Sequence, residues 1–400
     1  MANRLFKIAG GLLLLGAFAS GAIGKNGPRD CDHPDPSRSI KGCTAVIEDK
    51  SSTADLRARA LLKRGIGHFA SRQLDLAIAD FEAARQINPN DLIAYNELGL
   101  SYQMKGDMTH ALEAFDAGLK LFPDDGSLHY NRGQVYEQLN DLDKAIADYQ
   151  AAVELKPGER IGFLDTGKVE MIAAARLKSN HHGRLANAYA AKGDLERAAA
   201  TYENAIAVYP RNPRIYFERS KLFVARGDLA GARTDLDLAV KLEPQWAPIY
   251  TRRAMVAFQT DDFQQAAADY AQAWQIDRTG AGLPKDYIPL WHYIMLGRSD
   301  VNAASRALRE RLPAMDQSAW PFPIAKMLLG QQSIAQTLEA AITAEERCEA
   351  EFYSGELLLL QGDTAAARAA LTRAHDSCPN RFIEFKGAQI EIKRMASSGR

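Results

Sequence analysis

Two adjacent histidines, His181 and His182, are candidate metal ligands by residue type and spacing. Imidazole nitrogens are common ligands of zinc and copper, but a metal site needs several ligands that converge. Neighbouring residues on a helix point about 100° apart, and no carboxylate or cysteine lies three or four residues from either histidine. We therefore predict a solvated helix start at this pair and no metal site.

The short signatures of catalysis are missing from the sequence, which contains no Gly-x-Ser-x-Gly, His-Glu-x-x-His or Cys-x-x-Cys. Acid, base and nucleophile side chains do occur between residues 281 and 347, but without a recognised spacing: Asp286, His292, Ser299, Asp300, Ser305 and Glu310. We therefore predict a protein without catalytic residues or cofactors. The alternative is an envelope hydrolase with its active site in residues 281–347. The other acidic residues are predicted at helix starts and on outer faces, where water solvates them.

Residues 1–22 have the pattern of a secretory signal peptide. Arg4 and Lys7 precede an apolar, Ala/Gly/Leu-rich stretch at residues 8–24. Cleavage after Ala19 or Ala22 fits the preference for small residues at such sites, and an uncleaved anchor is the alternative. No later segment approaches 18 uninterrupted apolar residues, so we expect no stable membrane insertion after cleavage.

The cysteines refine the expected compartment. The first one is Cys31, and it does not follow the Leu-(Ala/Ser)-(Gly/Ala) sequence that a bacterial lipid anchor requires. All four cysteines follow the signal region, and an even number in an oxidising compartment favours disulfides. The chain also has no Asn-x-Ser/Thr sequon. These features favour a secreted protein of the bacterial periplasm.

Composition and charge bound the function class. The chain has 400 residues, 46% of them hydrophobic and 25% charged, which is typical of a globular protein. Its 49 Lys+Arg and 50 Asp+Glu residues give a formal net charge of -1. Nonspecific binding to nucleic acid depends on positive charge, so we predict no nucleic-acid partner.

A period of 34 residues organises most of the chain. Glycine, alanine, aromatic and proline residues recur in one register, at Gly65, Gly99 and Gly133, at Ala77, Ala111 and Ala145, at Phe81, Phe115 and Tyr149, and at Pro89, Pro123 and Pro157. The phase shifts once and resumes at Ala198, Ala232 and Ala266. Small residues at positions 8 and 20, a large one at 24 and proline at 32 resemble the tetratricopeptide repeat, a two-helix hairpin.

The pattern has a physical explanation. Two antiparallel helices approach closely where side chains are small, so position 8 is expected to meet position 20, while the side chain at 24 fills the space between hairpins. The short turn between the two helices needs a residue that tolerates left-handed dihedrals, followed by a helix cap. Four Gly-Asp pairs provide both: Gly106-Asp107, Gly193-Asp194, Gly227-Asp228 and Gly362-Asp363. The predicted fold is an all-α, right-handed helical-hairpin solenoid with a divergent helical C-terminal module.

The register divides the chain into consecutive segments. We predict a signal peptide (1–22), a capping helix segment (23–57), repeats 1–3 (58–157), an insertion (158–178), repeats 4–6 (179–280), a divergent helical segment (281–347), an isolated repeat (348–381) and a C-terminal capping helix with a tail (382–400). The capping helix is expected to start with Asp35 as its cap and Pro36 at its first position. A helical run at 169–178 is either an extra helix or an extension of the next repeat's first helix.

The C-terminal part carries a closer resemblance. Its motifs are Pro289-Leu290-Trp291-His292-Tyr293, Trp320-Pro321-Phe322-Pro323, and Phe352-Tyr353-Ser354-Gly355. Roughly residues 285–395 are similar to the NlpI-type tetratricopeptide lipoproteins. The resemblance implies a helical, dimeric periplasmic adaptor for peptidoglycan hydrolases and a protease, although the lipobox of those proteins is absent here. A purely structural homodimer is a further alternative.

The repeat scaffold also predicts how the cysteines pair. Position 1 of a hairpin's first helix lies beside the end of its second helix, so Cys348 and Cys378 can approach to disulfide distance. Cys31 and Cys43 are expected to join the segment before Pro36 to the capping helix. A crossed pairing between the two ends of the chain is the alternative.

Stacked hairpins also form a continuous concave surface. First-helix positions 2, 5, 9 and 12 face this groove in the family, and the predicted groove residues are Asn96, Tyr130, Gln134, Asn187, Phe217, Lys221, Arg252, Met255 and Phe258. Such a mixture of aromatic, amide and basic groups suits a protein partner or an extended peptide with some acidic character. We therefore predict an exported, non-catalytic protein-binding adaptor. Ordinary groove-lining residues without a specific ligand are the alternative interpretation of this set.

Overall fold

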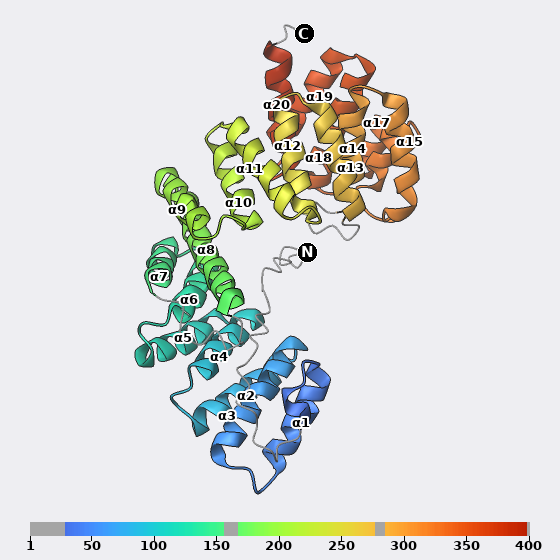
Figure 1. Ribbon diagram of the computed structural model, residues 1–400. Helices are drawn as coiled ribbons and strands as arrows, with labels where there is room; N and C mark the ends of the chain where they lie inside the picture. Colours follow the sequence, from blue (N-terminus) through green and yellow to red (C-terminus); the bar gives the residue numbers. More distant parts are fainter. Residues whose placement is uncertain (1–28, 156–166, 277–284, 398–400) are drawn as a thin grey trace. The chain divides into compact units, whose positions relative to one another are not determined.

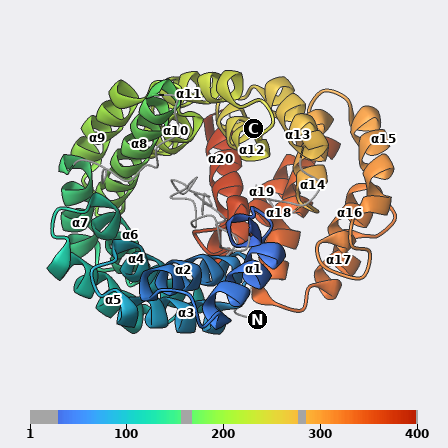
Figure 2. The same ribbon diagram turned by 60° about the horizontal axis from the view of Figure 1, so that its bottom comes forward.

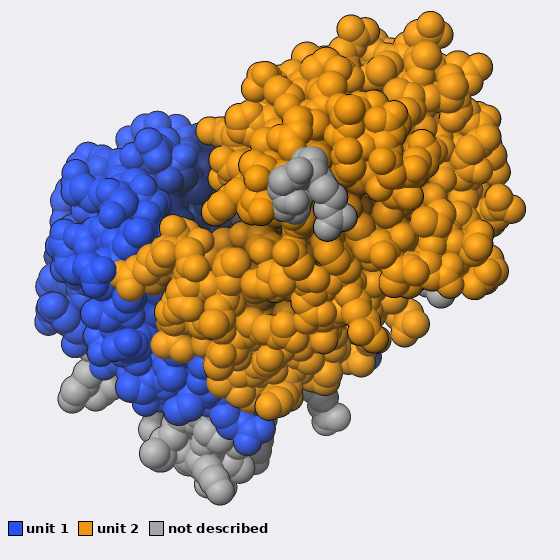
Figure 3. Space-filling model, turned by 90° about the horizontal axis from the view of Figure 1, so that it is seen from above, with its two compact units in different colours: residues 1–218 blue, residues 219–400 orange. Residues whose placement is uncertain are grey.

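The described part of the molecule is helical throughout. The computed structural model describes residues 29–155, 167–276 and 285–397, and every regular element in these ranges is an α-helix or a 3-10 helix (Figure 1). This confirms the predicted all-α class. The chain divides into two compact units, residues 1–218 and 219–400 (Figure 3), and the boundary falls within α10 (Pro213–Ala225). The predicted signal peptide lies outside the described residues.

Unit 1 contains a capping helix followed by helical hairpins. Its helices before α10 are α1 (Pro36–Glu48), α2 (Ala54–Ala70), α3 (Leu74–Ile87), α4 (Leu92–Lys105), α5 (Met108–Leu121), α6 (Gly126–Gln138), α7 (Leu142–Glu154), α8 (Gly167–Ala191) and α9 (Leu195–Val208). The hairpins are α2/α3, α4/α5, α6/α7 and α8/α9, and the second helix of each of the first three packs on the first helix of the next. The predicted stacking of helical hairpins is therefore observed.

Two of the predicted boundaries need comment. The first repeat's leading helix, α2, begins at Ala54 rather than at residue 58, because the Thr53 side chain caps it by accepting a hydrogen bond from the Leu56 amide. The helical run at 169–178 belongs to α8, so it extends the first helix of the fourth repeat and is not a separate helix. The predicted cap at Asp35 and the proline at the start of α1 are confirmed.

The turns between paired helices follow the Gly-Asp pattern. Gly106, Gly193, Gly227 and Gly362 all have φ between 78° and 86°, and the aspartate after each caps the next helix with its side chain. Asn140 holds the same place before Asp141 and adopts a φ of 60°. These turns confirm the local prediction, because left-handed backbone favours glycine or asparagine.

The small residue at position 8 has a nearer neighbour than the one expected. A Cβ atom on Gly99 would lie 2.4 Å from the ring of Phe115, the position-24 residue of the same hairpin, and one on Gly65 would lie 2.6 Å from the ring of Phe81. These two glycines therefore make room first for the large side chain at 24, whereas Gly355 in the last repeat lies against both Leu371 at position 24 and the Ala367 carbonyl oxygen at position 20. The aromatic ring fills its own hairpin because a flat side chain can pass where two helices nearly touch.

Unit 2 holds α11, the α12/α13 hairpin and the C-terminal module, which includes the α18/α19 hairpin of the isolated repeat. Its helices are α11 (Leu229–Leu242), α12 (Ala247–Gln259), α13 (Phe263–Ile276), α14 (Ile288–Gly297), α15 (Val301–Arg311), α16 (Phe322–Leu328), α17 (Ile334–Ala340), α18 (Ala344–Gln361), α19 (Thr364–Ser377) and α20 (Ile383–Ser397). Helix α14 packs on both α13 and α18 (Figure 2). The buried Trp291 of α14 joins these helices, with its ring 5.3 Å from Phe352 and 6.0 Å from Tyr270.

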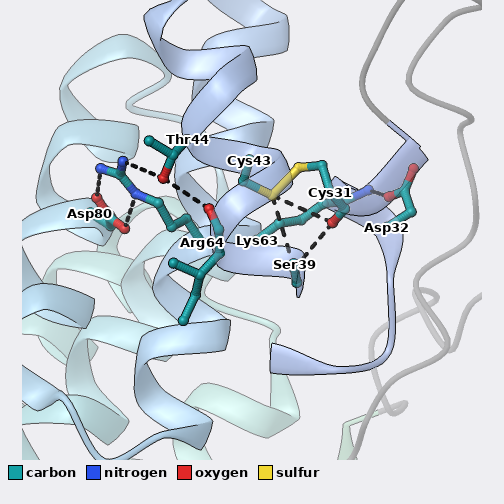
Figure 4. The surroundings of a disulfide bond; sticks show 9 residues. Cys31, Asp32, Ser39, Cys43, Thr44, Lys63, Arg64 and Asp80 are labelled. Carbon is teal, nitrogen blue, oxygen red and sulfur yellow. Dashed lines mark hydrogen bonds and ion pairs between the residues drawn. A yellow bond between two sulfur atoms is a disulfide. The ribbon is translucent and has the colours of Figure 1, made fainter. Parts of the chain in front are cut away.

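The structure contains two disulfides, both local. Cys31 is joined to Cys43, which ties the 3-10 turn Arg29–Asp32 to α1 (Figure 4). Cys348 is joined to Cys378, which ties the N-terminal part of α18 to the end of α19, with the two α-carbons 5.1 Å apart. All four cysteines are buried. The pairing is the local one, within each end of the chain.

None of the helices among the described residues is long and apolar enough to cross a membrane.

Candidate functional site

The predicted groove residues of unit 1 lie on the first helices of successive hairpins. Asn96 is on α4, Tyr130 and Gln134 are on α6, Asn187 is on α8 and Phe217 is on α10, and all five side chains are half-buried. Half-burial leaves each side chain partly open to solvent while its neighbours hold its position. This geometry permits the side chains to meet a ligand. The contacts among α4, α6 and α8 show how these helices are connected.

An amide bridge links α4 to α6. The Asn131 Nδ2 group donates to the Asn96 Oδ1 atom at 2.7 Å, and Asn96 Nδ2 donates to Glu97 Oε1 at 3.1 Å. Burial raises the pKa of Glu97 to about 7, and the hydrogen bond from Asn96 opposes this shift. The bridge orients three polar side chains across two repeats and leaves a carboxyl group that changes charge near neutral pH.

A second polar cluster links α6 to α8. Arg184 of α8 lies 3.7 Å from the Glu137 carboxylate of α6, and Tyr149 donates a 2.6 Å hydrogen bond to the same carboxylate. Burial acts to lower the pKa of Arg184, but the neighbouring Tyr130, Glu137 and Tyr149 outweigh it and the pKa is raised. A cation about one-third exposed, held by a fixed carboxylate, is suited to contact an acidic group of a ligand.

The histidine pair departs from its predicted place. His181 is 3% exposed in the middle of α8, its ring stacks on Tyr130 with a centroid distance of 4.3 Å, and its Nδ1 atom lies 3.3 Å from the Ala152 carbonyl oxygen. The expected solvated helix start was therefore wrong, because α8 begins earlier and carries this position into the hairpin stack. Within the described residues no group of His, Cys, Asp and Glu side chains is arranged to hold a metal ion.

The groove residues predicted in unit 2 have mixed outcomes. Lys221, Arg252 and Met255 are half-buried. Phe258 is fully buried, so its prediction as a groove residue was wrong. Helix α20 covers this position, because Arg394 Nη2 donates to the Phe258 carbonyl oxygen and the guanidinium lies over the Phe258 ring. The repeat pattern gave no indication of this distant contact.

A set of ion pairs recurs with the repeat and was missed by sequence reasoning. In four hairpins an arginine at position 7 makes a bidentate pair with a buried aspartate 16 residues later: Arg64 with Asp80, Arg132 with Asp148, Arg219 with Asp235, and Arg253 with Asp269. The aspartate side chains are 2% to 7% exposed. The prediction that acidic residues lie on outer faces was therefore wrong for these four. The shared register of the arginines and aspartates was the available signal.

Two arginines also reach the preceding repeat. Arg132 Nη1 donates to Asp116 at 2.6 Å, and Arg253 Nη1 donates to Asp237 at 2.7 Å, again at a spacing of 16 residues. Each of these guanidiniums is thus held between the second helices of two successive hairpins. Such pairs fix the packing of neighbouring repeats, because an unpaired buried charge is strongly unfavourable.

Unit 2 buries further carboxylates. Glu349 accepts hydrogen bonds from Tyr287 at 2.7 Å and from Trp320 Nε1 at 2.6 Å. Burial raises the pKa of Glu349, and these two donors oppose the shift. Arg298 donates to both Glu356 and Glu391. These contacts give the acidic residues and Trp320 structural roles inside the module.

The side chains considered for a hydrolase are not brought together. Asp300 caps α15 through the Ala303 amide, and the Ser299 hydroxyl donates to the Leu296 carbonyl oxygen. His292 is buried in α14, where burial lowers its pKa to about 3. In the described part of 281–347, none of the six candidates hydrogen-bonds to another: Asp286, His292, Ser299, Asp300, Ser305 and Glu310.

Comparison with known proteins identifies the repeats. A tetratricopeptide-repeat family model matches residues 62–125, 97–160 and 184–247, and a second one matches residues 349–381. The chain is therefore a tetratricopeptide-repeat protein. A stretch of 128 residues, 32% of the chain, is 29% identical to the Hsp70-Hsp90 organizing protein of Triticum aestivum and spans 20% of that protein's length.

Solved structures of the same repeat class are similar in part. A tetratricopeptide repeat protein from Parabacteroides merdae is 18% identical with a TM-score of 0.47, over 66% of this chain and 93% of that one. Pseudomonas aeruginosa pilF is 17% identical with a TM-score of 0.45, over 56% and 94%. YrrB, described as a TPR protein with an unusual peptide-binding site, is 18% identical with a TM-score of 0.39, over 56% and 99%. Stacked repeats of this kind form extended concave surfaces that such proteins use for binding.

Proposed function

We propose that this chain is an exported, non-catalytic adaptor that binds an extended protein segment along the first helices α4, α6 and α8. The observation that carries the proposal is the pair of polar clusters that connect these helices. Asn96 and Asn131 join α4 to α6, and Arg184 and Glu137 join α6 to α8. A ligand that crosses several hairpins meets a series of oriented polar groups here, which no single hairpin could supply.

The chemistry of these groups favours a peptide with some acidic character. Asparagine side chains can both donate to and accept from a peptide backbone. Arg184 supplies a positive charge, and Glu97, with a pKa of about 7, is only partly ionised at neutral pH. A partly neutral carboxyl repels an acidic ligand less than a fully charged one does.

The proposed site of action is the bacterial periplasm. The signal-like residues 1–22 and the two buried disulfides support export to an oxidising compartment. The resemblance of the C-terminal part to periplasmic adaptors favours cell-envelope hydrolases or proteases as the proteins that the chain organises.

Site-specific crosslinking tests the binding surface. A photo-crosslinking residue placed at Gln134, which is half-buried on α6, should capture a discrete partner in intact cells. The same residue placed at Lys120, which is exposed on the second helix α5, is the matched control. Equal products from both positions, or none from Gln134, would refute the proposed surface.

Fractionation tests the compartment. The protein should be recovered from the periplasm with its N-terminus at Ser20 or Ile23 and without free thiols. Recovery from the cytoplasm with an intact N-terminus would contradict export, while leaving the crosslinking result to judge the binding surface separately.

A further inference from the structure

A small pocket lies on another side of the second hairpin. It has a volume of about 100 Å³ and is lined by α3, α4 and α5, with Leu98 and Ala114 among its apolar residues. Residues two apart on a helix point in nearly opposite directions, so Leu98 faces away from the amide bridge at Asn96. The pocket is therefore separate from the proposed peptide-binding surface.

The pocket lies where another repeat holds an arginine. Thirty-four residues further along the chain, Leu98 corresponds to Arg132 and Ala114 corresponds to Asp148, which are joined by a bidentate ion pair. The second hairpin thus lacks both members of the pair that fills the third. A short apolar side chain and an alanine leave the space that a guanidinium and a carboxylate occupy one repeat later.

The groups that surround that arginine remain in the second hairpin. Arg132 is also held by Asp116, which corresponds to Glu82, and it lies 6.0 Å from the ring of Tyr136, which corresponds to Tyr102. Glu82 and Tyr102 both line the pocket, and the Tyr102 hydroxyl donates to Glu82 at 3.1 Å.

Three further residues complete the polar lining of the pocket: Glu113, Arg85 and His110. Glu113 adds a second carboxylate to the lining, at a position that is alanine in the third hairpin. Arg85 also lines the pocket, but its guanidinium lies over the Tyr95 ring at 5.8 Å. His110 lines the pocket too and stacks on Tyr102, with the ring centroids 5.1 Å apart. In the third hairpin the corresponding residue, Lys144, lies over the Tyr136 ring at 5.2 Å beside Arg132, so this neighbour leaves room for a guanidinium. The lining therefore combines two carboxylates, the stacked rings of Tyr102 and His110, the Arg85 side chain and an apolar floor, and its carboxylates and rings suit a planar cation.

We propose that this pocket binds the guanidinium group of an arginine side chain presented by a protein partner. The partner's arginine would take the place that Arg132 occupies in the next repeat, with Glu82 as its carboxylate and Tyr102 as its aromatic neighbour. The volume admits only the end of a side chain. A free amino acid would bring its own carboxylate close to Glu82 and Glu113, so an arginine within a polypeptide is the better ligand.

Two NMR measurements on the full chain test this proposal: ligand-observed saturation transfer for binding, and methyl-resolved spectra of the protein for the place of binding. The probe is N-acetyl-arginine N-methylamide, with its citrulline analogue as the neutral isostere and free L-arginine as the second comparison. We expect saturable binding of the first probe, with shifts of the Leu98 and Ala114 methyl groups, and at least about tenfold weaker binding of the citrulline analogue, because the charge-assisted bonds are lost. Equal binding of the two analogues would overturn the proposal.

Two variants and one control locate the site. Leu98→Arg with Ala114→Asp installs the ion pair of the third hairpin and should abolish binding while the far-UV circular dichroism stays helical. Glu82→Gln keeps the pocket volume and should weaken binding about tenfold, so it remains informative if the double variant misfolds. Lys120→Ala, at an exposed position of α5 outside the pocket lining, should bind the probe like the parent chain. Unchanged binding in Glu82→Gln would also overturn the proposal.

Discussion

The ring of His181 stacks on the ring of Tyr130, with their centroids 4.3 Å apart and their planes 24° from parallel. The contact joins α8 to α6 across two hairpins, and it places a titratable group inside the stack. Burial lowers the pKa of His181 from 6.5 to about 4, and the Ala152 carbonyl opposes the shift. The neutral form is therefore the one that the folded chain favours.

This burial predicts a loss of stability in acid. Between pH 6.5 and 4 the unfolded chain binds a proton at this histidine and the folded chain does not, so the free energy of unfolding falls as the pH falls through this window. The full effect is about 3 kcal/mol. His181→Phe should keep the stacking and remove this pH dependence, as measured by urea unfolding at pH 7 and pH 5. An identical pH dependence in the variant would contradict the assignment.

Glu97 predicts the opposite trend. Its pKa in the folded chain is raised from 4.5 to about 7, so the folded chain holds a proton that the unfolded chain releases between these values. The free energy of unfolding should therefore fall as the pH rises from 4.5 to 7. Glu97→Gln should lack this component when the two proteins are compared across the same pH range. A parallel pH profile for both would show that Glu97 titrates normally.

The recurring ion pairs predict a large difference between single and paired substitutions. Arg132→Leu leaves the buried Asp148 carboxylate without its main partner, and we expect a loss of about 3 kcal/mol in the free energy of unfolding. Arg132→Leu with Asp148→Ala reproduces the residues of the second hairpin and should recover most of that loss. Urea unfolding measures both. Equal losses in the two variants would mean that the charge pairing is not what the single substitution disrupts.

The C-terminal disulfide predicts a stability that depends on the redox state. Cys348 and Cys378 close a loop with a sequence separation of 30 residues, for which the chain-entropy model gives roughly 3 to 4 kcal/mol. Replacing both cysteines by alanine should lower the free energy of unfolding of unit 2 by this amount. Dithiothreitol should destabilise α18 and α19 in the parent chain. It should have no such effect on these helices in the variant, which lacks this disulfide. Hydrogen exchange within α18 and α19 measures the difference.

The tight approach at position 8 predicts a packing defect. Gly99→Ala places a Cβ atom 2.4 Å from the ring of Phe115, which is fully buried and cannot move freely. We expect a destabilisation of about 1 to 3 kcal/mol, which is typical of an overpacked core. Gly106→Ala tests a different cause, because its site is open and only its φ of 86° is unfavourable for alanine. If the ring is the obstacle, adding Phe115→Leu to Gly99→Ala should restore part of the lost stability, as measured by thermal unfolding.

Much of the fold could be predicted from the sequence because hairpin structure is local. The turn at Gly106-Asp107, the cap at Asp35 and the repeat length are set by residues within 34 positions of one another. Their repetition made the class visible without any knowledge of distant contacts. The positions of Asn96 and Tyr130 on first helices followed from the same register.

The features that sequence reasoning missed depend on contacts that the repeat does not specify. Phe258 occupies a groove position in the register, yet Arg394 of α20 covers it from 136 residues away. His181 has no ligand spacing and so suggested a solvated site, whereas α8 carries it against Tyr130. The sequence by itself determined the helices, their turns and their order, because these depend on neighbouring residues. Only the tertiary structure decided which polar groups are buried, since burial is set by whichever distant segment packs over them.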